Sequence, residues 1–408
     1  MKEQLGGREP RDFQVEIVQC QEERRDALCH AATGLGKTAV AAGPYALPEN
    51  QGRVTIMVSP LIGLQDEMAQ TFRQEYKVAS VAVNSGQGGC TMKLMKEITN
   101  GLYQIVLISP EMLLSRRFLD NVIRDPGFAS RVYSVVIDEA HCISHWGASF
   151  RKKYSAIGTI RVFLPRSVPF IALSASLTDR VSKDITHKLQ FTRAGYLHKN
   201  IGNDRSNVSI VVRAIHNTMN SFTDLDFLIP NQVTDPGTIK KTWIYVDNIA
   251  VGGDIIDHIR THLPEHLHGI IRPYNAVLGH EYRSEAMKEF RAGNIRILVC
   301  TDAAGMGCNV SDIDIVVQWK LPAKMSSFVQ RAGRAARGPG RMGLAILLVE
   351  PTAYTVRLEN EVNIELTKAA GSTRGKGKAR QGAKKGRARG SRKEEKEYAT
   401  QRGRYRGS

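Results

Sequence analysis

Residues 27–38 read ALCHAATGLGKT, in which a short apolar stretch leads into a turn with two glycines and then into Lys-Thr. Small residues let backbone N–H groups wrap around a phosphate, and the N-terminus of a following helix favours an anion. Lys37 can then reach the β- and γ-phosphates of a nucleotide, and the hydroxyl of Thr38 can bind Mg²⁺. We expect a nucleotide-binding loop here, rather than an ordinary glycine-rich turn, made of Thr33, Gly34, Leu35, Gly36, Lys37 and Thr38.

A pair of acidic residues follows a second apolar stretch. Residues 132–137 read VYSVVI, and Asp138-Glu139-Ala140-His141 comes directly after them. Open α/β sheets bind ligands at the carboxyl ends of their strands, so the two carboxylates should lie near the loop. We expect Asp138 to hold Mg²⁺ together with Thr38, and Glu139 to orient and deprotonate the attacking water.

Short runs rich in β-branched and apolar residues recur along the chain, with helix-like stretches between them. Strands buried on both faces of a parallel sheet have this nearly continuous hydrophobic character. The expected strands cover residues 54–59, 78–83, 105–109, 132–137, 170–173, 209–212, 243–246, 295–300, 313–317 and 344–349. The expected helices include residues 63–75, 178–189, 248–261 and 282–292. This alternation predicts an α/β fold.

The expected strands fall into two groups, which are separated by a polar segment at residues 198–207 that we interpret as a hinge. We therefore expect two α/β domains, at residues 1–200 and 201–360, and a tail at residues 361–408. Residues 371–408 hold 14 Lys or Arg against three Glu, which accounts for +11 of the net charge of +17. A segment with so few apolar residues should be disordered, and its charge suits DNA tethering, solubilisation or nuclear import.

The composition narrows the class of protein further. A chain of 408 residues with 42% hydrophobic and 24% charged residues is typical of folded globular proteins. No uncharged apolar run reaches the roughly 18 residues that a membrane span needs, so we expect no membrane partner. The six cysteines form no C-x-x-C pair and the last of them is Cys308, so we expect neither a zinc site nor a disulfide framework.

The residues after the acidic pair carry a resemblance to a known family. Residues 142–154 read CISHWGASFRKKY, and with DEAH before them they resemble the RecQ family of DNA helicases. Trp146, Phe150, Arg151 and Tyr154 match the family's aromatic-rich loop, which couples contact with single-stranded DNA to ATP hydrolysis. Base stacking on aromatic rings, worth ~1–3 kcal/mol per base, suits that role.

Other motifs of the same resemblance follow along the chain. Arg11 and Gln14 resemble the R-x-x-Q element with which the family reads adenine. Gln330, Arg334 and Arg337 resemble part of its Q-x-x-G-R-A-G-R motif, which implies that the two arginines reach the γ-phosphate as arginine fingers. DNA contact or coupling is implied for Ser59, Pro60, His141, Ser174, Ser176 and Thr301.

The resemblance implies two tandem RecA-like domains with mostly parallel sheets that hydrolyse ATP with Mg²⁺. It further implies a 3′–5′ DNA helicase that acts on single-stranded and forked DNA, with accessory proteins of DNA repair and recombination. We also expect the protein to be a monomer, and its basic tail favours a location in the nucleus. The family's four-cysteine zinc module and winged helix are not expected here. Two alternatives stay open at this point: an RNA-directed helicase, and a non-catalytic nucleic-acid-binding relic of a helicase.

Overall fold

The computed structural model describes residues 1–60, 62–85, 88–145, 152–192, 195–302, 310–338 and 340–354 of the chain. Residues 1–354 form one compact unit. The predicted basic tail, residues 361–408, lies outside the described residues. Within the described part of the chain, no helix is long and apolar enough to cross a membrane.

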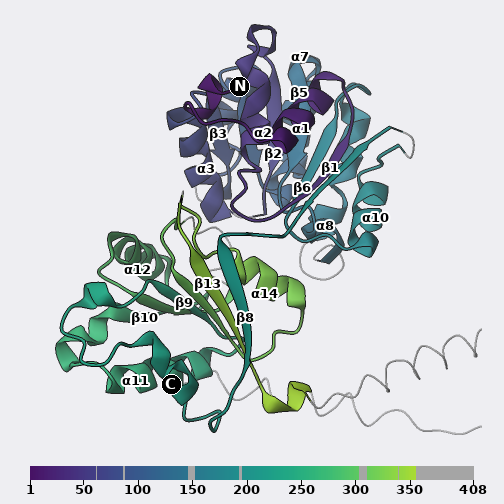
Figure 1. Cartoon of the computed structure of the whole chain (residues 1–408). Helices are drawn as coiled ribbons and strands as arrows, with labels where there is room; N and C mark the ends of the chain where they lie inside the picture. The colour runs from purple at the N-terminus through teal and green to yellow at the C-terminus, as the bar shows by residue number, and fades with distance from the viewer. Residues whose placement is uncertain are drawn as a thin grey trace, which may run out of the picture. The chain divides into compact units, whose positions relative to one another are not determined.

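The first sheet has seven strands, all parallel, in the order β3-β4-β2-β5-β6-β1-β7. Helices cover both of its faces (Figure 1). Its strands are β1 (Ala27–Ala31), β2 (Val54–Val58), β3 (Ser80–Val83), β4 (Ile105–Ile108), β5 (Val132–Ile137), β6 (Phe170–Ser174) and β7 (Leu197–Gly202). Its helices are α1 (Asp12–Glu22), α2 (Ala39–Ala42), α3 (Ile62–Gln74), α4 (Met92–Thr99), α5 (Pro110–Leu113), α6 (Arg116–Phe118), α7 (Pro126–Arg131), α8 (Cys142–His145), α9 (Lys152–Ser155) and α10 (Asp179–Lys188).

Two apolar cores hold these layers together, one on each face of the first sheet. Phe13 of α1 and Phe72 of α3 pack in the same core as α2, the helix that follows the predicted nucleotide-binding loop. Phe118, Phe128 and Tyr154 pack in the core on the opposite face, with α10. Because β1, β2, β4, β5 and β6 are buried along their whole length, apolar residues are required at nearly every position of these strands.

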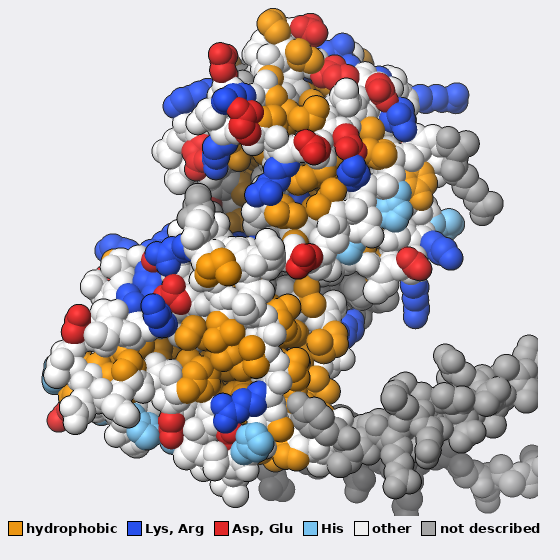
Figure 2. All heavy atoms as spheres, viewed as in Figure 1, with side chains coloured by type: hydrophobic (Ala, Val, Ile, Leu, Met, Phe, Trp, Pro, Cys, Tyr) orange, Lys and Arg blue, Asp and Glu red, His pale blue; other side chains and the backbone are white. Residues whose placement is uncertain are grey.

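The second sheet has six parallel strands in the order β10-β11-β9-β12-β13-β8. These are β8 (Val208–Ala214), β9 (Thr242–Tyr245), β10 (Ile271–Tyr274), β11 (Ile297–Cys300), β12 (Ile315–Trp319) and β13 (Gly343–Val349). Helices α11 (Ile249–Thr261), α12 (His280–Ala292) and α14 (Met325–Ala332) pack on it. The edge strand β8 exposes Ile210, Val211 and Val212, and Figure 2 shows apolar side chains gathered where β8 lies.

Short turns of helix complete the described structure. They are η1 (Glu3–Leu5), η2 (Gly43–Ala46), η3 (Pro48–Asn50), η5 (Leu119–Ile123), η6 (Ile157–Phe163), η7 (Thr223–Leu228), η8 (Pro236–Thr238), η9 (Glu265–Ile270) and η10 (Pro351–Tyr354). The predicted α/β fold with two mostly parallel sheets is confirmed.

The predicted hinge over residues 198–207 is wrong for its first five residues. Residues 197–202 form β7, which pairs with β1 at the edge of the first sheet. An edge strand keeps one side in contact with water, so β7 carries polar side chains such as Lys199, which pairs with Glu16 at 2.6 Å. Strand β10 was not expected either, because Pro273 interrupts a stretch of only four residues.

Candidate active site

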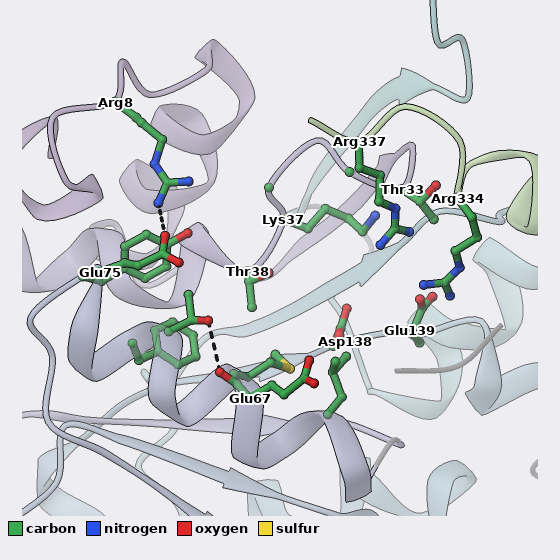
Figure 3. Close-up of a pocket in the computed structure, with 17 residues that line it drawn as sticks. Arg8, Thr33, Lys37, Thr38, Glu67, Glu75, Asp138, Glu139, Arg334 and Arg337 are labelled. Atoms are coloured by element: carbon green, nitrogen blue, oxygen red, sulfur yellow. Dashed lines mark hydrogen bonds and ion pairs between the residues drawn. The ribbon is translucent and has the colours of Figure 1, made fainter. Parts of the chain in front are cut away.

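A pocket of about 370 Å³ opens where four segments meet (Figure 3). Its walls come from the loop after β1, from α3, from the end of β5 and from the turn after α14. Arg8 and Glu75 form an ion pair at one end of it. Of the predicted nucleotide-site residues, it brings together Thr33, Gly34, Gly36, Lys37, Thr38, Asp138, Glu139, Arg334 and Arg337.

The loop after β1 has the backbone shape of a phosphate cradle. Gly34 and Gly36 have φ angles of 81° and 75°, in the left-handed region that favours glycine. Ala31 stands where the strict form of this phosphate-binding motif, the P-loop, has glycine. It is the last residue of β1 and is fully buried, and its φ is not positive, so this position does not require glycine. The ammonium of Lys37 donates to the carbonyls of Ala31 and Ala32 at 2.9 and 3.0 Å. Burial lowers the pKa of Lys37, so a bound anion would stabilise its charged form.

Four predicted nucleotide-site residues lie elsewhere. The amide nitrogen of Gln14 donates to the Gly36 carbonyl at 2.8 Å, and its amide oxygen accepts from the backbone N–H of Arg11. Gln14 thus supports the loop from behind, whereas the side chain of Arg11 is exposed. Leu35 packs against the apolar core, and Gln330 lies beside His141.

The two acidic residues occupy the end of β5. The backbone N–H of Asp138 donates to the Val58 carbonyl at 2.9 Å, and the hydroxyl of Tyr154 donates to the Asp138 carbonyl at 3.0 Å. Burial, reinforced by the charge of Glu139, raises the pKa of Asp138. A divalent cation would offset that cost, and the oxygens of Asp138 and Thr38 are the hard ligands that Mg²⁺ prefers. Glu139 has a φ of 47°, a strained conformation that is typical of functional sites.

A hydrogen-bonded network leads from Glu139 to α14. Nδ1 of His141 lies 3.3 Å from Oε2 of Glu139 and 2.9 Å from the hydroxyl of Ser174, and the Ser176 N–H donates to that hydroxyl. The amide nitrogen of Gln330 lies 3.3 Å from Nε2 of His141. Burial lowers the pKa of His141, which favours the neutral ring. Because the amide nitrogen of Gln330 donates and cannot accept, the network is consistent with His141 protonated at Nδ1.

The two arginines of the turn after α14 bring positive charge to the part of the pocket that holds the two carboxylates. Lys37, Arg334 and Arg337 face the two carboxylates Asp138 and Glu139 (Figure 3). Burial and the neighbouring charge of Arg334 lower the pKa of Arg337, whose Nε donates to the Gly333 carbonyl at 3.1 Å. An anion with several charged oxygens would offset both effects, so the donor set fits a nucleoside triphosphate bound with a divalent cation.

Comparisons with known proteins match two parts of the chain to helicase domains. The family model of the DEAD/DEAH box helicases matches residues 11–185, and that of the helicase conserved C-terminal domain matches residues 236–339. Over 362 residues the chain is 28% identical to the ATP-dependent DNA helicase RecQ of Haemophilus influenzae, covering 87% of this chain and 53% of that protein. The chain belongs to the RecQ family of helicases.

Two further similarities define the extent of the match. The bifunctional 3′–5′ exonuclease/ATP-dependent helicase WRN of Mus musculus is 29% identical over 323 residues, which are 78% of this chain and 21% of that protein. The DEAD-box helicase Mss116, solved with ssRNA and UDP-BeF, has the same fold, with a TM-score of 0.66 and 19% identity over 86% of this chain and 72% of that one. This RecQ-family chain spans about half the length, or less, of these curated relatives.

Arg205, for which the sequence predicted no role, joins the loop to the arginine turn. Its guanidinium donates to the carbonyls of Thr33 and Ala336, both at 2.9 Å. The Thr33 hydroxyl also donates to the Gly333 carbonyl at 3.1 Å. The signal was present in Asp204-Arg205-Ser206-Asn207, which resembles the RecQ D-R-P-N element, but the resemblance identified no contact for it.

Ala336 stands where the RecQ motif has glycine, and the structure shows the consequence. Its φ is 45°, in the left-handed region. We expect Ala336→Gly to stabilise the chain by up to about 1 kcal/mol, because glycine removes the cost of that conformation. The midpoint of thermal unfolding measures the effect. Ala335→Gly is the control, since Ala335 is buried without a positive φ and its replacement should lower the midpoint. A lower midpoint for Ala336→Gly as well would contradict this account.

Apart from His141, which lies in the network described above, the residues predicted to contact or couple to DNA fall into three groups. The first group is buried, so in this structure its side chains are not exposed to a DNA strand: Ser59, Pro60, Tyr154, Ser174 and Ser176. Thr301 lines a separate pocket of about 440 Å³, together with Arg260 and Arg272. The remainder of the aromatic-rich loop, with Trp146, Phe150 and Arg151, lies outside the described residues.

Proposed function

We propose that this chain is an ATP-dependent 3′–5′ DNA helicase core that hydrolyses ATP as it moves along single-stranded DNA. One observation carries the proposal: Lys37, the carboxylates of Asp138 and Glu139, and the guanidinium groups of Arg334 and Arg337 line a single pocket. Loss of function usually removes some of these groups, and all five are in place. The observation therefore favours an active enzyme over a non-catalytic relic.

Each of these residues has a distinct role in phosphoryl transfer. Mg²⁺, when bound by Thr38 and Asp138, would neutralise charge on the β- and γ-phosphates. Lys37 and the N–H groups of the loop hold the phosphates. Glu139 orients the attacking water and accepts its proton. Arg334 and Arg337 stabilise the charge that develops on the γ-phosphate.

The network around His141 supports coupling between hydrolysis and movement. Glu139 contacts His141, which contacts Ser174 on β6 and Gln330 on α14. These contacts connect Glu139 to α14, which packs on the second sheet, so a shift of Glu139 during turnover would change the position of Gln330. The DNA helicases named among the relatives favour DNA as the track of this motor.

Steady-state hydrolysis of ATP with Mg²⁺ tests the proposal, measured without nucleic acid and then with single-stranded DNA or RNA of matched sequence. We expect DNA to stimulate hydrolysis well above RNA, Lys37→Ala to abolish it, and Trp146→Ala to leave basal hydrolysis but remove the stimulation. Equal stimulation by RNA would favour the RNA-directed helicase. Wild-type rates no higher than those of Lys37→Ala would identify a binding relic.

The remaining parts of the proposal need separate measurements. Unwinding of forked duplexes that carry a 3′ or a 5′ single-stranded tail tests the polarity, and light scattering tests whether the chain is a monomer. We also propose action in the nucleus with accessory proteins of DNA repair, supported by the basic segment 371–408. Microscopy of the full chain and of a chain with neutralised residues 384–393 tests the location.

A further inference from the structure

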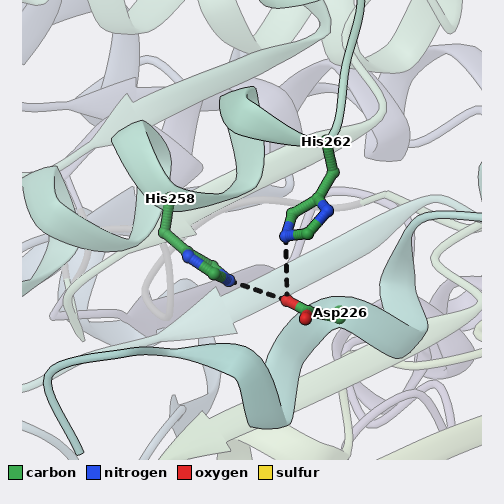
Figure 4. Close-up of side chains that lie close together, drawn as sticks. All are labelled: Asp226, His258 and His262. Atoms are coloured by element: carbon green, nitrogen blue, oxygen red, sulfur yellow. Dashed lines mark hydrogen bonds and ion pairs between the residues drawn. The ribbon is translucent and has the colours of Figure 1, made fainter.

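A second cluster of titratable side chains lies on the layer that covers the second sheet, away from the residues of the nucleotide pocket. Asp226 comes from η7, and His258 and His262 come from the last turn of α11 and its C-terminal cap (Figure 4). Both imidazole rings point to the same carboxylate oxygen: Oδ1 of Asp226 lies 2.7 Å from Nε2 of His258 and 3.3 Å from Nε2 of His262. No role in nucleotide or DNA binding accounts for this convergence.

The separations within the cluster suit a metal ion. One nitrogen or oxygen atom from each of the three side chains lies within 4.8 Å of the others. Two ligands at 2.0–2.1 Å from a tetrahedral Zn²⁺ are separated by about 3.3 Å, so small rotations of the side chains would bring all three atoms to bonding distance. His258 and the cap residue His262 are about one helical turn apart at the end of α11, and their ring centroids lie 5.1 Å from each other.

The elements that carry the three side chains are held together by apolar packing. Leu225 and Leu228 of η7 share one core with Ile255 and Ile259 of α11. The ring of Phe222 lies 6.1 Å from that of His258, at the inner side of the cluster. A site on such a packed support needs little reorganisation on binding a metal.

The outer side of the cluster is open to solvent. The His258 side chain is 16% exposed, whereas those of Asp226 and His262 are 38% and 40% exposed. An ion can therefore enter from water, and water can complete its coordination. Two imidazoles and one carboxylate with a solvent position are a donor set that borderline divalent cations such as Zn²⁺ and Co²⁺ accept.

We propose that Asp226, His258 and His262 bind a divalent transition metal ion of the Zn²⁺ class and thereby clamp η7 to α11. The competing explanation is that Asp226 only accepts hydrogen bonds from the two rings. The sequence predicts no zinc site because the cysteines form no C-x-x-C pair, and that reasoning does not cover this site, whose donors are imidazole nitrogens and a carboxylate. Its spacing H-x-x-x-H is visible in the sequence, but Asp226 lies 32 residues upstream and only the fold brings it there.

Calorimetric titration of the full chain, stripped of metal by a chelator, with ZnCl₂ tests the proposal. We expect one saturable site in the wild type. His258→Gln and Asp226→Asn each remove a metal ligand, so each should lower the affinity for Zn²⁺ by at least about 10- to 100-fold, the loss caused by removing a residue that only hydrogen-bonds to a ligand. His266→Gln is the matched control, since His266 is an exposed histidine of the neighbouring η9. It should bind Zn²⁺ as the wild type does.

The visible absorption of bound Co²⁺ gives an independent measurement of the ligands. We expect the wild type and His266→Gln to give the same spectrum, and His258→Gln and Asp226→Asn to lose it. Thermal unfolding without metal verifies that the variants are folded. The proposal is overturned if the wild type shows no saturable binding, or if the cluster variants bind Zn²⁺ as tightly as the wild type. Neither measurement involves ATP or DNA, so its outcome is independent of the proposed helicase activity.

Discussion

Replacement of Arg337 by alanine is expected to lower kcat for ATP hydrolysis by about 10³- to 10⁵-fold, the usual effect of an arginine finger. Arg337 lines the pocket with Lys37 and Glu139, and an ideal Cβ on Gly34 would lie 3.7 Å from its Cγ, so its side chain lies against the phosphate loop. The effect should fall on kcat and much less on nucleotide affinity, because the charge that Arg337 stabilises develops during transfer.

Two variants separate a role in the transition state from a role in folding. Arg337→Lys keeps a positive charge but loses the planar donor fork, so we expect it to recover only part of the activity. Arg341→Ala removes an arginine four residues later that pairs with Asp314 at 3.2 Å, and it should leave kcat nearly unchanged. Binding of a fluorescent ATP analogue measures affinity in each variant. A modest loss of kcat in Arg337→Ala, with a large loss in Arg334→Ala, would assign the finger to Arg334.

The parts of this site that sequence alone predicts are those set by local chain geometry. Lys37 and Thr38 come directly after a glycine turn at the end of one buried strand. Asp138 and Glu139 come directly after a second buried strand. Parallel strands bring such ends to one edge of a sheet, so the pocket can be expected before its structure is known.

The contacts that sequence does not predict join residues far apart in the chain. Gln330 meets His141 across 189 positions, and Arg205 meets Thr33 across 172. No local pattern records such pairings, since they depend on how α14 and the segment before β8 pack in the folded chain. Gln14 is a further example, because its amide nitrogen donates to the carbonyl of Gly36 in the loop and the sequence did not predict this contact.

Glu139→Gln is expected to reduce hydrolysis by about 10²- to 10⁴-fold, the range for loss of a general base, while nucleotide binding is retained. Glutamine has nearly the same shape, so the contact with His141 and the left-handed backbone at this position should survive. The loss should appear in single-turnover hydrolysis, which isolates the chemical step from product release.

Glu67→Gln is the matched control for this variant. Glu67 lines the same pocket, but its carboxylate pairs with Arg291 at 2.9 Å, and we assign it no contact with the attacking water. We therefore expect only a small change in its single-turnover rate. If Glu139→Gln hydrolysed ATP at a rate close to that of Glu67→Gln, the base would have to be another group. Because burial lowers the pKa of His141 and its Nδ1 lies 3.3 Å from Oε2 of Glu139, it would be the next residue to replace.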